Sequence, residues 1–463
     1  MPEPSIANSR ARRRRSASLA AGEAPLESGV PFALLVSFTL LTFLNLPNRL
    51  AAIGAIRPTV VFVVLLTLCV FGNWENVKTR LMTRESKMLL AIIVYIIASL
   101  PFVEWPGSVI TKNFELFIRA AVFFLFVVAF VDSVNRLRVF IFVFVGTQVF
   151  RILEPLGLHE LNGYWGGVTY FSGESMMRLA GAPSDPVNGN GLAFVVVTAL
   201  PFVHFWCASK WSTFRTLLYV LLVPAMVFTL VLTASRSGMI ALGAIMLGLV
   251  WFSKHRVKWI ALLVACVALA IPHLSDDQRD RYLSIVDHTT KQGATAEGRI
   301  SAWGTNFEVF SHRPIFGFGV GTSQEAGYNI AGDTHYAHNL YLEVMIELGV
   351  VGFVLFGAYL VGVMRLTRDV VRQVIEQGRG VAGGVPEILI WLPKAMLVWI
   401  AMCLLFSFAS FGFSEYEWYM FGGLAVVLAK LSRQAQPAEL SRDTPGNSAA
   451  KRSARGTRAF TQI

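Results

Sequence analysis

Twelve apolar segments recur along this chain, and each is close to the length that a helix needs to cross a lipid bilayer. A spanning helix takes about 20 mostly apolar residues. Of the 463 residues, 54% are hydrophobic and 15% are charged, whereas soluble domains carry about 25% charged residues. The composition therefore excludes a string of soluble domains and predicts an all-α polytopic membrane protein with about 12 transmembrane helices. The predicted spans lie near residues 31–47, 58–72, 88–103, 114–131, 137–153, 189–207, 215–234, 237–252, 259–273, 338–364, 388–411 and 416–431.

The basic residues predict the orientation of these spans. An even number of spans places both termini on one side, and Arg10 with Arg12–Arg15 marks that side as cytoplasmic. With this assignment, 27 of the 40 Lys and Arg residues are cytoplasmic, ten are external and three lie inside spans. Residues 237–273 could form one kinked pair or two spans, and basic residues at 254–258 favour two. The net charge of +11 thus reflects membrane topology and gives no reason to expect nucleic acid as a partner.

The chain divides into one transmembrane domain and two tails. Residues 31–431 form the predicted domain, with long external segments at 154–188 and 274–337, the second between spans nine and ten. The tails 1–30 and 432–463 are rich in Ser, Ala, Pro, Gly and Arg, which predicts disordered cytoplasmic segments whose charges contact anionic lipid headgroups. The first apolar run lacks a small-x-small cleavage site, so we expect an anchor rather than a cleaved signal.

The four cysteines give no sign of a disulfide framework or a metal site. Cys69, Cys207, Cys266 and Cys403 all fall in predicted spans, and none has CxxC spacing. The sequence also lacks an HExxH motif and an Asp-x-Asp pair near the loops. We therefore expect neither a metal nor a cofactor.

Four motifs follow one another through the external segments and their flanks. They are RLAGAPSDPVNGNGLAF at 178–194, TASRSGMIAL at 233–242, GR-x3-W at 298–303 with PIFGFGVGT at 314–322, and HN-x-YLE-x3-ELG at 338–349. No single piece is specific, but the four in order, at matching topological positions, resemble the O-antigen ligase and polymerase superfamily of bacterial envelope glycosyltransferases.

The resemblance implies a donor glycan carried on a polyprenyl diphosphate at the periplasmic face of the bacterial inner membrane. No ATP is available outside that membrane, so the donor must arrive activated, and the diphosphate is its leaving group. Placing the acceptor hydroxyl and stabilising the diphosphate charge can supply most of such catalysis. The family scheme of single displacement further implies a metal-independent transfer with inversion at the anomeric carbon.

His338 opens a long apolar span just inside the external boundary. In matching family members this histidine is the essential one, so the resemblance assigns it as the catalytic base that takes the proton from the acceptor hydroxyl. An imidazole with a pKa near neutrality suits that task. A histidine that caps a helix or contacts lipid headgroups is the structural alternative. His335 is the rival base if His338 has a structural role.

Three external arginines are candidates for binding the diphosphate. Arg236 lies in a very short turn between two spans, at headgroup depth, and its planar fork matches phosphate oxygens; a cation that only snorkels to the interface is the alternative. The resemblance adds Arg299 as a second diphosphate ligand, and Trp303 would share its helix face four residues later. Arg178 and the turn-rich segment 183–191 are placed at the same external site.

Carboxylates inside spans are costly and therefore informative. Asn339, Glu343 and Glu347 recur every four residues and form one polar stripe on an apolar helix. They orient His338 or pair with an arginine, or else they form structural hydrogen bonds between helices. Glu115 and Arg119, also four residues apart, are expected to form a structural ion pair.

The glycines of PIFGFGVGT alternate with bulky residues at positions 317, 319 and 321. The motif lacks the GK[ST] of a phosphate-binding P-loop. We expect a tight external turn at which the backbone approaches another segment or the substrate.

Several functions fit these features. A ligase that transfers the glycan to lipid A core is favoured, because one large external loop directly precedes His338 and the spans number about twelve. A second lipid-linked glycan as acceptor would make the chain a polymerase, and a protein hydroxyl would make it a protein glycosyltransferase. A transporter of small anions such as bicarbonate would show internal repeats and charges near the midplane, whereas here the charges cluster at one face. A structural scaffold would not need these residues to converge.

Overall fold

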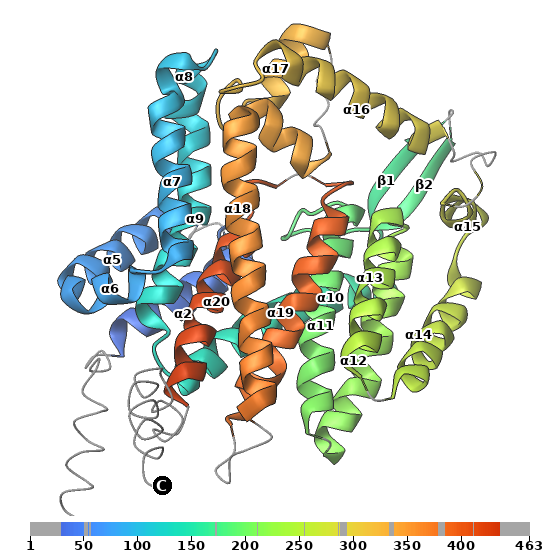
Figure 1. The fold of residues 1–463 in the computed structure, drawn as a ribbon. Helices are drawn as coiled ribbons and strands as arrows, with labels where there is room; N and C mark the ends of the chain where they lie inside the picture. The colour runs from blue at the N-terminus through green and yellow to red at the C-terminus, as the bar shows by residue number, and fades with distance from the viewer. Residues whose placement is uncertain are drawn as a thin grey trace, which may run out of the picture.

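The computed structural model describes residues 29–50, 54, 57–171, 174–210, 212–253, 255–285, 287, 294–332, 338–377, 385–410 and 412–435. Each of the twelve predicted segments contains a helix (Figure 1). In chain order these helices are α2 (Val30–Phe43), α5 (Pro58–Gly72), α7 (Arg84–Ser99), α9 (Phe114–Phe130), α10 (Val134–Asn162), α11 (Gly189–Ser209), α12 (Thr213–Leu232), α13 (Arg236–Phe252), α14 (Arg256–Ala270), α18 (Leu340–Gln377), α19 (Glu387–Phe406) and α20 (Tyr416–Gln434).

The remaining elements lie between these helices. They are α3 (Leu46–Arg49), α6 (Trp74–Leu81), η1 (Leu100–Phe102), α8 (Pro106–Ser108), η2 (Val109–Asn113), β1 (Gly166–Phe171), β2 (Glu174–Leu179), η3 (Ile271–His273), α15 (Asp276–Leu283), α16 (Ala294–His312) and α17 (Ser323–Ala331). The pair β1 and β2 is an antiparallel hairpin inside the predicted external segment 154–188, so a small strand pair accompanies the helices.

The helices make this chain an integral membrane protein. Within the described residues, eight helices are long and apolar enough to cross a membrane, and α5 with α6 adds a ninth if the 96° bend between them lies within one broken span. Helices α2 and α13 are apolar but shorter. The predicted count of twelve spans therefore remains a prediction, as do the domain boundaries.

Side-chain caps explain where several helices begin. The side chains of Ser133, Asn188, Ser212 and Ser235 each accept a hydrogen bond from the backbone N–H three residues later. Such a cap satisfies one of the N–H groups that the first helical turn leaves without a partner. The caps of α11 and α13, Asn188 and Ser235, lie within motifs that the sequence singled out.

Helix α20 lies in the core of the bundle and packs closely on α9 and α18. A Cβ atom on Gly422 would lie 1.9 Å from the Tyr359 hydroxyl, and one on Gly423 would lie 2.9 Å from the carbonyl oxygen of Phe124. Small residues at these positions allow the helices to approach each other. In α9, Glu115 and Arg119 form the ion pair that the sequence predicts.

The elements β1, β2, α15, α16 and α17 gather at one end of the bundle, at the top of Figure 1. We call this the loop-bearing end. Helix α16 packs against α18, and the side-chain amide of Gln278 in α15 donates to the carbonyl of Met177 in β2 over 2.9 Å. The two long external segments of the sequence thus contact each other above the helices.

Helix α18 is interrupted at Gly349, whose φ of 64° and ψ of −170° are not helical. The PIFGFGVGT segment pairs with the backbone beside this break: Gly319 N–H donates to the Glu347 carbonyl over 2.8 Å, and Val350 N–H donates to the Pro314 carbonyl over 2.8 Å. A Cβ atom on Gly317 would lie 2.5 Å from the carbonyl oxygen of Glu347. The predicted close approach of this glycine-rich turn to another segment is confirmed.

Candidate functional site

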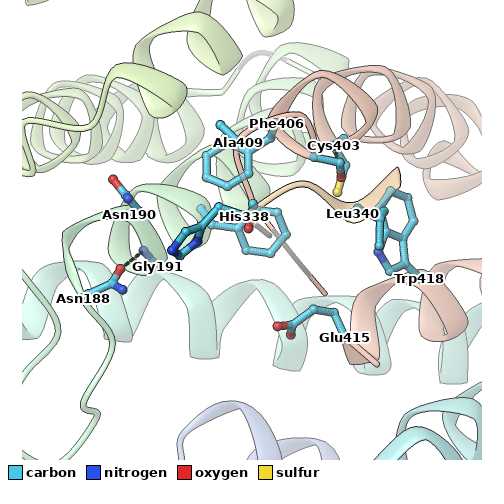
Figure 2. Close-up of a pocket in the computed structure, with 13 residues that line it drawn as sticks. Asn188, Asn190, Gly191, His338, Leu340, Cys403, Phe406, Ala409, Glu415 and Trp418 are labelled. Atoms are coloured by element: carbon cyan, nitrogen blue, oxygen red, sulfur yellow. Dashed lines mark hydrogen bonds between the residues drawn. The ribbon is translucent and has the colours of Figure 1, made fainter. Parts of the chain in front are cut away.

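A cavity of about 160 Å³ at the loop-bearing end contains His338. Three parts of the chain line it: the start of α11, the start of α18, and the segment that joins α19 to α20 (Figure 2). The lining residues are Asn188, Asn190, Gly191, Phe194, His338, Leu340, Cys403, Phe406, Ser407, Ala409, Ser410, Glu415 and Trp418.

His338 is half-buried and immediately precedes α18. Its φ of 43° lies in the left-handed region, which a non-glycine residue adopts only when its surroundings impose it. Two hydrogen bonds of the residues that follow His338 fix the backbone here. Leu340 N–H donates to the Ser407 carbonyl over 2.9 Å, and the Asn339 side-chain oxygen accepts from Tyr341 N–H at 3.0 Å. The backbone therefore holds the imidazole at the cavity.

The two glutamates of the α18 stripe are buried and bind backbone N–H groups. A carboxylate oxygen of Glu343 accepts from Gly412 N–H at 2.7 Å, and one of Glu347 accepts from Ser323 N–H at 3.4 Å. These contacts hold the segment before α20 and the start of α17. Both carboxylates thus form structural hydrogen bonds, and their donors are backbone N–H groups of the segment before α20 and of the first residue of α17.

A second polar cluster surrounds the short turn between α12 and α13. Three side chains from elsewhere donate to its carbonyl groups: Arg178 Nε to Thr233 at 2.7 Å, Arg281 Nε to Ala234 at 2.8 Å, and the Tyr282 hydroxyl to Val231 at 2.8 Å. Within the turn, Ala234 has a φ of 47°, in the left-handed region. Burial raises the pKa of the Tyr282 hydroxyl well above its usual value, so it stays a donor. We call these residues, with Ser235, Arg236 and Ser284, the turn cluster.

Asn190 joins the turn cluster to the His338 cavity. Its side-chain oxygen accepts from Arg178 Nη2 at 2.8 Å and from the Ser235 hydroxyl at 2.9 Å, and the same residue lines the cavity. Arg236, which follows Ser235 in the chain, donates from Nη1 to the Ser284 hydroxyl over 2.9 Å. Arg178 and Arg236 are 7% and 8% exposed, so both charges are largely removed from water and are held by polar partners.

The predicted site residues are brought to one end, but they do not all share one cavity. The described residues that line the His338 cavity include neither Arg178 nor Arg236; Arg178 donates to Asn190, which lines the cavity, and Arg236 donates to Ser284. Arg299 lies on α16, and its side chain is outside the described part of the structure. His335, the rival base, also lies outside the described residues.

Trp303 of α16 reaches the segment beside the cavity. Its ring centroid lies 6.5 Å from that of Phe408, and Phe408 lies 4.7 Å from Tyr341 in the first turn of α18. Phe408 is adjacent to Ser407 and Ala409, which line the cavity. These aromatic contacts place the helix that carries Arg299 over the cavity region.

Three residues that the sequence reading did not single out belong to this site: Asn190, Arg281 and Glu415. Asn190 was part of a turn-rich segment, and Arg281 was one of ten external basic residues. Glu415 precedes α20 and lines the cavity with His338.

Comparison with known proteins found a family match that covers part of this site. Residues 219–357 match a family model described as O-Antigen ligase. The match includes Arg236, Arg299, Trp303 and His338, and it begins after Arg178 and Asn190. No curated protein matches the chain. The resemblance to the O-antigen ligase and polymerase superfamily is confirmed.

Proposed function

We propose that this chain, a member of the O-antigen ligase and polymerase superfamily through residues 219–357, transfers a glycan from a polyprenyl diphosphate to an acceptor at the periplasmic membrane surface. The observation that carries the proposal is the link from the His338 cavity through Asn190 to Arg178 and to Ser235, the residue before Arg236 in the turn cluster. All of these groups lie at the loop-bearing end of a membrane bundle, where a lipid-linked donor and a polar acceptor can meet.

In the proposed reaction, the acceptor hydroxyl oxygen attacks the anomeric carbon of the donor glycan. The bond from that carbon to the diphosphate oxygen breaks, and the electron pair leaves with the polyprenyl diphosphate. The His338 imidazole takes the hydroxyl proton as the new bond forms, and attack from the face opposite the leaving group inverts the anomeric centre. Positive charge near the leaving diphosphate stabilises the transition state.

The arginines differ in what the structure suggests for them. Arg178 donates to Thr233, Thr169 and Asn190, so we assign it a positioning role that supports the turn and Asn190 rather than direct diphosphate binding. Arg236 is the first residue of α13, and its hydrogen bond to the Ser284 hydroxyl fixes the direction of its side chain. We assign Arg236 to the diphosphate. Arg299 is the second proposed diphosphate ligand, on the helix that Trp303 anchors.

Lipid A core is the acceptor that we favour, and the glycan profile of a deletion strain tests this. For a ligase, polymer disappears from lipid A while lipid-linked polymer accumulates. A polymerase instead leaves lipid A capped with single repeats, because only chain growth is lost. Normal glycans on lipid A and on the lipid carrier would remove both glycosyltransferase functions and would return the small-anion transporter to consideration.

Arg236→Gln is expected to reduce glycan transfer by about 10²- to 10³-fold, which is typical of removing one charge-stabilising donor. Arg236→Lys keeps the charge but loses the planar fork, so we expect an intermediate loss. The measurement is complementation of the deletion strain, with lipid-linked and lipid A-linked glycan quantified together. Arg279→Gln is the matched control, because Arg279 lies at the same end on α15, is exposed, and pairs with Asp276. Transfer by Arg236→Gln equal to that of Arg279→Gln, at equal membrane abundance, would exclude Arg236 from the reaction.

A further inference from the structure

A second polar cavity, of about 550 Å³, lies toward the end of the bundle at which α20 finishes. It is lined by the junction between α6 and α7, by Leu366 of α18, and by the last turns of α20. Four basic side chains face it, Arg80, Arg84, Lys430 and Arg433, against the single carboxyl of Glu85. The lining therefore carries a net positive charge.

The basic residues fall into a fixed part and an accessible part. Arg80 is 5% exposed; it donates to the Ala129 carbonyl over 2.8 Å and pairs with Asp132 at 3.5 Å, so it is built into the lining. Arg84 and Arg433 are exposed, and within the described part of the chain neither forms an ion pair with an acidic side chain. Their charges are thus available to an anion from outside.

An apolar cavity of about 430 Å³ lies on the other side of the same junction. It is lined by α5, α6, α7 and α9, and Leu81, Ser86 and Lys87 of the junction contribute to it. Helix α6 bends 96° from α5 and buries Val77 while it exposes Lys78, the pattern of a helix that lies along a membrane surface. Residues 79–87 therefore border a basic cavity and an apolar groove together.

We propose that this pair of cavities binds an anionic phospholipid, with its phosphate headgroup at Arg84 and Arg433 beside Lys430 and an acyl chain in the apolar groove. Positive charge selects an anion, and the adjoining groove selects an anion that carries a hydrocarbon chain. The location supports a lipid of the cytoplasmic leaflet, because these residues belong to the predicted cytoplasmic segments. Each basic residue near such a surface contributes an attraction equivalent to about a fivefold change in binding.

The test uses the purified full-length chain in a detergent micelle and counts retained lipid by native mass spectrometry. With equal amounts of phosphatidylglycerol and phosphatidylethanolamine present, the wild type is expected to retain the anionic lipid preferentially. The double variant Arg84→Gln/Arg433→Gln is expected to weaken retention of phosphatidylglycerol by about tenfold or more. The matched control is Arg365→Gln/Arg372→Gln, which removes two exposed arginines of α18 that do not line the cavity, and it is expected to behave as the wild type.

Three results would overturn the proposal. Equal retention of the two lipids by the wild type would remove selectivity for an anion. Equal weakening by both double variants would show a general attraction of the basic surface rather than a site. Displacement of phosphatidylglycerol by millimolar inorganic phosphate, with the same thermal stabilisation from phosphate alone, would identify a soluble-anion site. The first and third measurements need no variant, so they decide the matter even if the double variant fails to fold.

Discussion

His338→Asn is expected to reduce glycan transfer by about 10²- to 10⁴-fold while membrane insertion stays normal, because general base catalysis typically contributes that factor. Asparagine is the better first substitution because the φ of His338 is 43°, and asparagine tolerates this left-handed conformation with little strain. His338→Ala removes the imidazole too, but it adds backbone strain. The measurement is transfer by purified protein from a polyprenyl diphosphate donor, at matched protein amounts.

His312→Asn is the matched control for the base. His312 is exposed at the end of α16, and its Nδ1 lies 3.0 Å from the Glu308 carbonyl, so the same substitution there leaves the cavity untouched. Retention of more than half of the transfer activity by His338→Asn would exclude the imidazole as the base. In that case His335, the rival base, would be the next histidine to replace.

The helices of this fold could be predicted from the sequence because apolar length is a local property. Their ends could not. Helix α10 continues to Asn162, into a segment predicted as external loop, and it stops at Gly163, whose φ of 68° caps the helix. The 96° bend between α5 and α6 was also not predicted, because a single glycine, Gly72, at the end of an apolar segment does not by itself indicate a break.

Site residues could be predicted from the sequence only where a single motif contained both the reactive side chain and its position at the start of a helix. His338 and Arg236 each lie at the start of an apolar helix, and that position is visible in the sequence. Asn190 and Glu415 enter the site because α11 and α20 meet α18 at one end, which is a result of packing across the bundle. The spacing of residues in the sequence does not indicate which helices pack together at this end.

The carboxylate stripe shows the same division. The four-residue spacing of Glu343 and Glu347 correctly predicts one buried helix face. What they bind depends on Gly412, before α20, and on Ser323, the first residue of α17. The periodicity of the sequence indicates which face of α18 is buried, whereas the tertiary structure determines which N–H groups bind the two carboxylates.

Gly349→Ala is expected to destabilise the protein by about 2–6 kcal/mol, the largest stability effect of any substitution proposed for α18. A φ of 64° with a ψ of −170° is essentially restricted to glycine and costs other residues about 1–3 kcal/mol. A Cβ atom would also lie 2.1 Å from the Ile315 carbonyl oxygen, an overlap that only a backbone shift can relieve, at a further cost of about 1–3 kcal/mol. The measurement is thermal unfolding in detergent, followed by the folded yield on size-exclusion chromatography.

Gly357→Ala is the control, because it makes the same substitution in the same helix. A Cβ atom there meets nothing within 4 Å, so this variant is expected to be neutral or to gain up to about 1 kcal/mol from the helix propensity of alanine. Equal stability of the two variants would show that the break at Gly349 is not required. The break matters for function because it directs the first turns of α18, which carry Asn339 and Glu343, toward the segment before α20. Any Gly349→Ala protein that still folds should therefore lose transfer activity, since the same turns hold His338 at its cavity.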